Sequence, residues 1–291
     1  MSPAATLALL EATALITWET WPTSGSDWDC RHTAAAYLTD LAGTLAVASL
    51  GRRMTSISQA HETAGHESPT KTKPVREAMK GIRRTFGVAT TKKAPLRSTD
   101  IRTLVGTLDV DTLGGLRDRA LLVVGFAGAF RRSELVALDV DDIDSGPDGL
   151  VVHIRRSKTD QEGEGASIGL PYGSDPSTCP VRTLRAWLDA AGITAGAIFR
   201  QVTRHGVIGG RMSGGAAADR VKRAAGRAGL DAARYGGHSL RAGLITSAME
   251  GGAQEHRTML HSRHKSVHVF RGYIRDLNLL DGDNPVARVG L

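Results

Sequence analysis

Apolar positions recur at helical spacing in the first 90 residues of the chain. The clearest case is the segment 49–65, which ends at a glycine and carries four apolar residues at this spacing: Leu50, Met54, Ile57 and Ala60. Segments 27–43 and 73–87 also have typical helix signals, a terminal glycine in the first and Pro74 in the first turn of the second. The pattern predicts an all-helical first part of the chain.

The pattern changes in the later part of the chain. Residues 115–130 are almost wholly apolar, which predicts a deeply buried helix. Residues 149–171 alternate between apolar and polar side chains on either side of the break DQEGEG, and this predicts a β-hairpin. Segments 179–192 and 215–230 again carry helix signals. The fold is therefore predicted to be mostly α with a small β-sheet, a helical domain followed by an α+β domain.

A polar stretch without periodicity, TTKKAPLRSTD, separates the two patterns and contains Pro95. A chain of 291 residues suits one or two domains. We expect a helical domain over 1–92, a linker over 93–98 and a second domain over 99–291.

The composition indicates a globular protein with a basic surplus. Hydrophobic residues make up 41% of the chain, and the formal net charge is +7. The surplus favours a polyanionic partner, most simply nucleic acid. Aromatic residues make up only 4%, which disfavours single-strand binding by base stacking and favours the backbone of duplex nucleic acid.

Cysteine usage and hydropathy indicate a reduced, cytoplasmic compartment. Cys30 and Cys179 are far apart and predict neither a disulfide framework nor a zinc ribbon. The sequence has no membrane-spanning run of apolar residues, and its first residues are not typical of a signal peptide. We therefore expect no contact with a membrane.

Between Lys71 and Arg97 the chain has nine Lys or Arg residues and a single acid, Glu77. Such a run is either a solvated helix face or a surface that contacts phosphates, and the sequence leaves both interpretations open. The candidate DNA-contacting residues of this run are Lys80, Arg83, Arg84, Lys92 and Lys93.

Several side chains could act on an anion. Arg131 and Arg132 follow the apolar run, where a guanidinium is costly unless it is paired, for example with Glu134, or faces a cleft. His238 and Arg241 of GGHSLRAG would share one face of a helical turn. Taken alone, a lysine at the end of a hairpin strand, as in SKTDQEG, is usually a solvated charge.

Four histidines lie near the C-terminus in a basic setting: His256, His261, His264 and His268. A metal site is disfavoured there because the neighbouring arginines and lysine would repel a divalent cation, whereas a phosphate would suit the same residues. Tyr273 follows His264 by nine residues. A lone tyrosine is normally a packing residue.

The order of these residues is more informative than any one of them. It runs Arg, Lys, His-x-x-Arg, His, Tyr and, with FRRSEL, SKTDQEG, GHSLRAG and H-x8-Y, it resembles the tyrosine recombinases, or phage integrase family, and similar integrases of bacterial mobile elements. The resemblance implies a helical core-binding (SAM-like) DNA-binding domain followed by a catalytic domain. The catalytic residues that it implies are Arg131, Lys158, His238, Arg241, His264 and Tyr273.

The resemblance also implies a reaction. Tyr273 would attack a phosphodiester of duplex DNA and form a 3′-phosphotyrosine, with Lys158 as general acid on the departing 5′-oxygen. Because the bond energy is kept and cations surround the phosphate, neither ATP, a metal ion nor another cofactor would be needed. The expected assembly is a homotetramer on two DNA sites, formed from monomers or dimers that are free of DNA. The expected location is the bacterial cytoplasm, in association with the nucleoid.

Two positions depart from the family's pattern. The family usually has glycine before its third-position histidine, where this chain has Arg263, and often has TGLR where this chain has GAFR, with Ala129 and Phe130. We expect Arg263 to alter the turn or add a phosphate contact, and Arg132 to contact DNA. The alternatives are a non-catalytic DNA-binding relic, a type IB topoisomerase and, more remotely, a histidine metalloenzyme.

Overall fold

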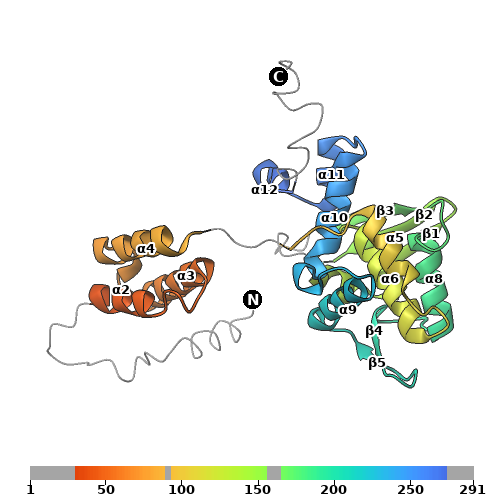
Figure 1. Cartoon of the computed structure of the whole chain (residues 1–291), viewed down its shortest axis with the longest axis horizontal. Helices are drawn as coiled ribbons and strands as arrows, with labels where there is room; N and C mark the ends of the chain where they lie inside the picture. Colours follow the sequence, from red (N-terminus) through yellow and green to blue (C-terminus); the bar gives the residue numbers. More distant parts are fainter. Residues whose placement is uncertain (1–29, 89–92, 156–164, 274–291) are drawn as a thin grey trace, which may run out of the picture. The chain divides into compact units, whose positions relative to one another are not determined.

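A computed structural model describes the protein over residues 30–88, 93–155 and 165–273 (Figure 1). The chain divides into two compact units, residues 1–92 and residues 93–291. Among the described residues, no helix combines the length and apolar character that crossing a membrane requires.

The first unit is helical in its described part. Its elements are α2 (Cys30–Asp40), α3 (Val47–Thr63), the 3-10 turn η2 (Pro69–Lys71) and α4 (Lys73–Phe86). They enclose a small apolar core that includes Leu38, Leu50, Val75, Met79 and Ile82. Pro74 lies in the first turn of α4, where its fixed φ suits a helix and its missing N–H is no loss. The three predicted helices are confirmed.

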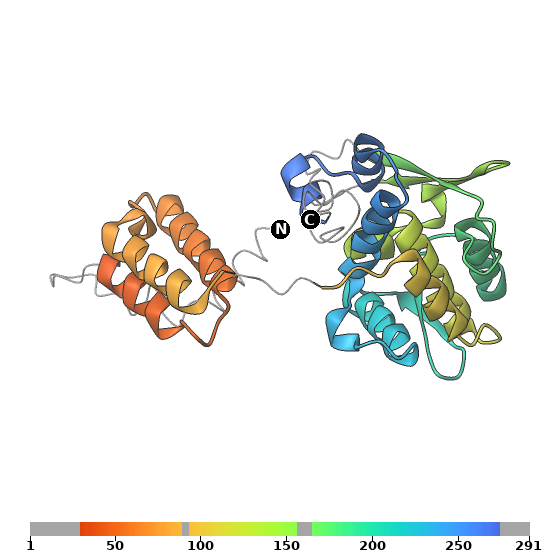
Figure 2. The same cartoon turned by 45° about the horizontal axis from the view of Figure 1, so that its top comes forward.

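Among the described residues, the second unit holds the remaining helices and both sheets. Its helices are α5 (Ser98–Gly106), α6 (Leu113–Ala127), α7 (Arg132–Ala137), α8 (Pro180–Ala191), α9 (Gly214–Arg227), α10 (Gly237–Glu250), α11 (Glu255–Ser262) and α12 (Val267–Arg271), with 3-10 turns η3 (Val140–Asp142) and η4 (Ala232–Arg234). α6 packs against α8 and α10, and α10 also contacts α9 and α11 (Figure 2). As predicted, the apolar stretch of α6 is buried.

A three-stranded antiparallel sheet follows α7 in the order β1-β2-β3. Its strands are β1 (Ile143–Gly146), β2 (Gly149–Ile154) and β3 (Ala166–Pro171). Val152 pairs with Ile143 on one side and Ile168 on the other, so alternate residues of β2 enter the core. The hairpin predicted over 149–171 is confirmed in its two strands. A second pair, β4 (Arg200–Val202) and β5 (Ile208–Arg211), has no counterpart in the sequence prediction.

The segment predicted as a linker packs on the second unit. The backbone N–H groups of Ala94 and Leu96 donate to the carbonyls of Arg234 and Ser239. Leu96 is fully buried, and a Cβ at Gly243 of α10 would lie 1.7 Å from the Leu96 carbonyl oxygen. This close approach requires glycine at that position, and it ties the start of the unit to the helix that carries His238 and Arg241.

Candidate active site

Five of the six candidate catalytic residues gather at one place in the second unit. Tyr273 follows α12, and its hydroxyl lies 2.7 Å from Nε2 of His238. The ring of His264 stands edge-on to the Tyr273 ring, with centroids 5.3 Å apart. Nη2 of Arg241 is 3.4 Å from the His264 ring nitrogens. Lys158 lies outside the described residues.

α10 positions two of these side chains in its first turns. The helix begins at Gly237, and the Ser239 hydroxyl accepts a hydrogen bond from the Gly236 backbone N–H at 3.1 Å. His238 and Arg241 then follow three residues apart, as the sequence predicts. Arg241 is only 1% exposed, and its Nη1 donates to the Ala129 carbonyl at 2.7 Å. A buried guanidinium with a fixed backbone partner is a preorganised donor.

Arg131 precedes α7 and pairs with Glu134, as the sequence suggests. Glu134 accepts from the Arg131 backbone N–H at 2.9 Å and from its Nη1 at 2.6 Å. The carboxylate is 1% exposed. Burial raises the pKa of Glu134, but the Arg263 charge and the bonds from Arg131 outweigh it, so the net pKa is lowered. Glu134 therefore remains a carboxylate among the arginines.

The cations and burial keep both histidines of the cluster neutral. Burial, then the charges of Arg241 and Arg131, lower the pKa of His264 to about 4. The same causes, in the same order, lower the pKa of His238. A neutral His238 has a lone pair that can accept the proton of the Tyr273 hydroxyl. Burial raises the pKa of Tyr273, against the charge of Arg241, so that hydroxyl is protonated before reaction.

Ser262 is a buried contributor to the cluster that sequence reasoning missed. Its Oγ lies 2.8 Å from His264 Nδ1 and 2.7 Å from the Thr258 carbonyl. Because the single hydroxyl proton goes to the Thr258 carbonyl, Oγ accepts from Nδ1–H of His264, and Nε2 of the neutral imidazole keeps its lone pair. A lone serine beside a histidine carries no distinguishing pattern in the sequence.

The structure divides the predicted DNA-contacting residues into two groups. Lys80, Arg83 and Arg84 are exposed on α4, and Lys93 and Arg132 are exposed in the second unit. Lys92 lies outside the described residues. Arg263 instead points inward, with 9% of its side chain exposed, and bonds to Glu134 and backbone carbonyls. Its contacts identify it as an internal residue.

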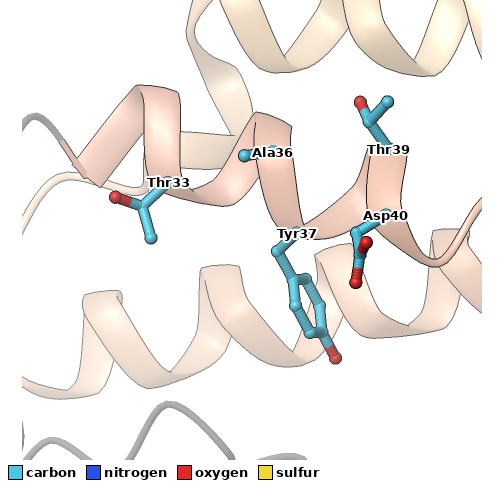
Figure 3. A pocket seen from close by; sticks show the side chains of 5 residues that line it. All are labelled: Thr33, Ala36, Tyr37, Thr39 and Asp40. Carbon is cyan, nitrogen blue, oxygen red and sulfur yellow. The ribbon is translucent and has the colours of Figure 1, made fainter.

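Neither a metal-binding group nor a hollow on α2 adds a residue to the candidate active site in the described part of the chain. The described residues hold no group of three or more His, Cys, Asp or Glu side chains that could bind a metal ion. An open hollow on α2 is lined by Thr33, Ala36, Tyr37, Thr39 and Asp40 (Figure 3). The Tyr37 hydroxyl there accepts from Arg53 of α3 at 2.6 Å, and no candidate catalytic residue lines the hollow.

Comparisons with known proteins give one consistent result. The family model "Phage integrase family" matches residues 94–278. The integrase/recombinase xerD homolog of Selenomonas ruminantium is 39% identical over 278 residues, which cover 91% of this chain and 81% of the relative.

Solved structures share the fold at low sequence identity. An integrase of the Tn1549 transposon, solved with transposon right-end DNA, matches with a TM-score of 0.67 at 11% identity, over 99% of this chain and 93% of that chain. A lambda integrase dimer bound to a core site matches with a TM-score of 0.64 at 16% identity, over 95% and 90% of the two chains. These two likenesses concern the fold.

Proposed function

The chain belongs to the phage integrase family of tyrosine recombinases, and from this premise we propose that it cuts and rejoins duplex DNA at specific sites through a 3′-phosphotyrosine intermediate. The observation that carries the proposal is the short contact between the Tyr273 hydroxyl and His238, beside the buried Arg241. A nucleophilic tyrosine needs a neighbouring base that takes its proton, and a neutral imidazole at this distance can do so.

In the proposed first step, the Tyr273 oxygen attacks the scissile phosphorus and the bond to the 5′-oxygen breaks. The phenolic proton passes to His238 Nε2, and Lys158 gives a proton to the departing 5′-oxygen. The phosphodiester is exchanged for a phosphotyrosine, so no energy source is consumed. Attack by a 5′-hydroxyl on the phosphotyrosine reverses these steps and reseals the strand.

The arginines stabilise the charge that builds up on the non-bridging oxygens. Arg131 and Arg241 each offer a planar fork that suits phosphate geometry. His264, with its proton on Nδ1, accepts from Nη2 of Arg241 through Nε2 and so helps to hold that guanidinium. Because Arg241 is fixed by the Ala129 carbonyl before DNA arrives, its donors cost little reorganisation during the reaction. This cationic set also supports cleavage without a divalent metal, which cleavage in EDTA would test.

Lys80, Arg83, Arg84, Lys92, Lys93 and Arg132 are proposed to contact the phosphates of the duplex. We further propose that protomers, single or paired without DNA, assemble as a tetramer on two sites in the bacterial cytoplasm, at the nucleoid. Light scattering of the protein with and without its site measures this stoichiometry.

Covalent trapping tests the proposed function. A duplex with a nick beside the cleavage position loses a short fragment after cleavage, which prevents religation and accumulates the protein–DNA adduct. We expect an adduct whose trapped DNA has a defined sequence. A non-catalytic relic would bind DNA and form no adduct. A type IB topoisomerase would relax supercoiled DNA without exchanging strands between two sites.

A further inference from the structure

Two non-glycine residues have left-handed backbone conformations in the described part of the chain. Ala129 has a φ of 44° and Arg263 a φ of 56°. Such conformations are unfavourable for residues with a Cβ and persist only when the surroundings hold them. Both lie next to candidate catalytic residues, since Ala129 precedes Arg131 by two positions and Arg263 immediately precedes His264. They are also the two positions where the sequence lacks the family's glycine.

The side chain of Arg263 joins these two unusual positions. Its Nη2 donates to the Ala129 carbonyl at 3.0 Å and to Glu134 at 3.0 Å. Its Nη1 donates to the carbonyls of Gly128 at 3.1 Å and His261 at 2.9 Å. Arg263 therefore connects the end of α11 to the turn between α6 and α7, and holds that turn through two consecutive carbonyls.

The residues on either side of Ala129 are shaped to fit this arrangement. The guanidinium carbon of Arg263 lies 5.4 Å from the centroid of the Phe130 ring. The same ring also covers Gly128, where a Cβ would lie 2.1 Å from a ring carbon. A larger residue at position 128 would displace the ring, so Gly128, Phe130 and Arg263 depend on one another.

The Ala129 carbonyl links this arrangement to the chemistry. It accepts from Arg263 and also from Nη1 of Arg241, the latter at 2.7 Å. A change of φ at Ala129 toward negative values would turn that carbonyl and remove the support of Arg241. Glu134 is shared in a similar way, between Arg263 and Arg131. Arg263 thus bonds to the partners of both proposed phosphate-binding arginines.

We propose that Arg263 is a positioning residue: it holds Ala129 in the left-handed conformation that aims its carbonyl at Arg241, and so replaces by a side-chain contact what glycine would supply at both positions. This inference rests on the proposed function, because Arg241 matters only if it binds the reacting phosphate. It assigns Arg263 a role inside the protein in place of the predicted DNA contact.

The inference predicts a specific interaction between positions 263 and 129. Arg263→Gly removes the guanidinium and so releases the Ala129 carbonyl. The resulting misplacement of Arg241 should slow single-turnover adduct formation by about 10²-fold, the cost typical of an ångström-scale misalignment. DNA affinity should change by less than about threefold, because Arg263 lies inside the protein. Since glycine adopts φ of 44° without strain, Ala129→Gly should restore about tenfold of the lost rate in the R263G background.

The experiment measures adduct formation and DNA binding for wild type, R263G, A129G and the double variant. Arg257→Ala on α11 is the matched control: it removes an exposed arginine six residues away and should not slow adduct formation. The proposal requires that A129G raise the rate more in R263G than in wild type, which is a positive coupling in the double-mutant cycle. Equal effects in the two backgrounds overturn it, as does a wild-type rate in R263G or a loss explained by weaker binding.

Arg263→Lys separates geometry from charge. Lysine keeps the positive charge but cannot donate to two carbonyls and a carboxylate with a planar fork, so R263K should cleave slowly and A129G should improve it. A wild-type rate in R263K would show that only charge matters and would reject the positioning role. If R263G does not fold, as judged by circular dichroism, the cycle with R263K decides the question in the same way.

The wild-type protein in the same series separates the two hypotheses. If it forms no adduct on any cleavable duplex, the proposed function fails and the role of Arg263 fails with it. If it forms the adduct while the coupling between positions 263 and 129 is absent, only the positioning role fails.

Discussion

The exposed cations of α4 and the largely buried arginines of the second unit use positive charge in two ways. Lys80, Arg83 and Arg84 lie on the solvent side of a helix whose other face packs Val75, Met79 and Ile82 into the core. Arg131, Arg241 and Arg263 are instead held by a carboxylate and backbone carbonyls.

The two sets differ in how much hydration each side chain must lose when it binds a phosphate. An exposed cation is hydrated and screened by salt, so each contact adds a modest, sequence-independent increment to binding. A buried arginine has already lost its water during folding, and burial, together with the charge of Arg131, lowers the pKa of Arg241 to about 10. The second set is therefore expected to control the rate of cleavage and the first set the affinity for DNA.

Removal of the nucleophile should have the largest effect on cleavage and sharpen this division. Tyr273→Phe deletes only the hydroxyl, so adduct formation should fall below detection while the affinity for duplex DNA stays within about twofold. Gel electrophoresis of the trapped adduct and a binding titration measure the two quantities. An alkali-stable adduct formed by the variant would show that another residue attacks the phosphate.

Removal of Lys158 should have the next largest effect on the rate of cleavage. Without a general acid, Lys158→Ala should slow adduct formation by about 10² to 10⁴-fold. A substrate with sulfur at the 5′-bridging position has a leaving group that needs no proton, and the variant should cleave it nearly as fast as wild type does. Equal defects on the two substrates would assign Lys158 another role.

Loss of one buried guanidinium should slow cleavage somewhat less than loss of Lys158 does. Arg241→Lys keeps the charge but loses the paired donors, and the rate of adduct formation should fall by about 10² to 10³-fold, as for removal of one preorganised donor. Arg83→Lys on α4 is the matched control, and its rate at saturating DNA should equal that of wild type. Similar rate losses in the two variants would break the distinction between the sets.

The sequence revealed these two sets unequally. Candidate catalytic residues were predictable because their order and motifs are local features of the chain. The packing of Leu96 was not, since one apolar residue in a polar stretch has no periodicity. The strands β4 and β5 were missed because both are short and β5 includes two glycines. Arg263 resembled an exposed cation in the sequence, since its partners include backbone carbonyls that no side-chain pattern reports.

Acid should lower the stability of the protein through His264, which lies beside Arg241. The pKa of His264 is about 4 in the folded protein, against about 6.5 in an unfolded chain. As the pH falls below 6.5 the unfolded chain binds a proton that the folded protein does not, so the free energy of unfolding falls until about pH 4. Its slope from this residue is at most about 1.4 kcal/mol per pH unit, and less because the ring is partly exposed.

Urea denaturation between pH 7 and pH 5 measures this dependence, with fluorescence of the buried Trp187 as the probe of the second unit. His264→Gln should reduce the slope. His66→Gln, at an exposed position of the first unit, is the control and should retain the slope of wild type. An unchanged slope in H264Q would mean that His264 does not resist protonation in the folded protein.

The exposed set should have the smallest effect on cleavage and a distinct effect on binding. If Lys80, Arg83 and Arg84 contact phosphates, neutralising each side chain reduces the number of counterions that the DNA releases when the protein binds. The slope of log affinity against log salt should then fall by about 0.9 per lost contact, while adduct formation at saturating DNA keeps its wild-type rate.

Lys71→Ala is the internal control for this measurement, because the Lys71 ammonium already pairs with Glu62 at 2.9 Å in the same unit. An exposed ion pair of this kind adds little to stability, and its lysine is already paired. Removing Lys71 should therefore change the salt slope of DNA binding less than any one of the three α4 substitutions does. A wild-type slope in the triple variant would identify the α4 cations as a solvated face. A reduced rate at saturating DNA would instead show that α4 influences the reacting phosphate, and the separation of rate from affinity between the two sets would not hold.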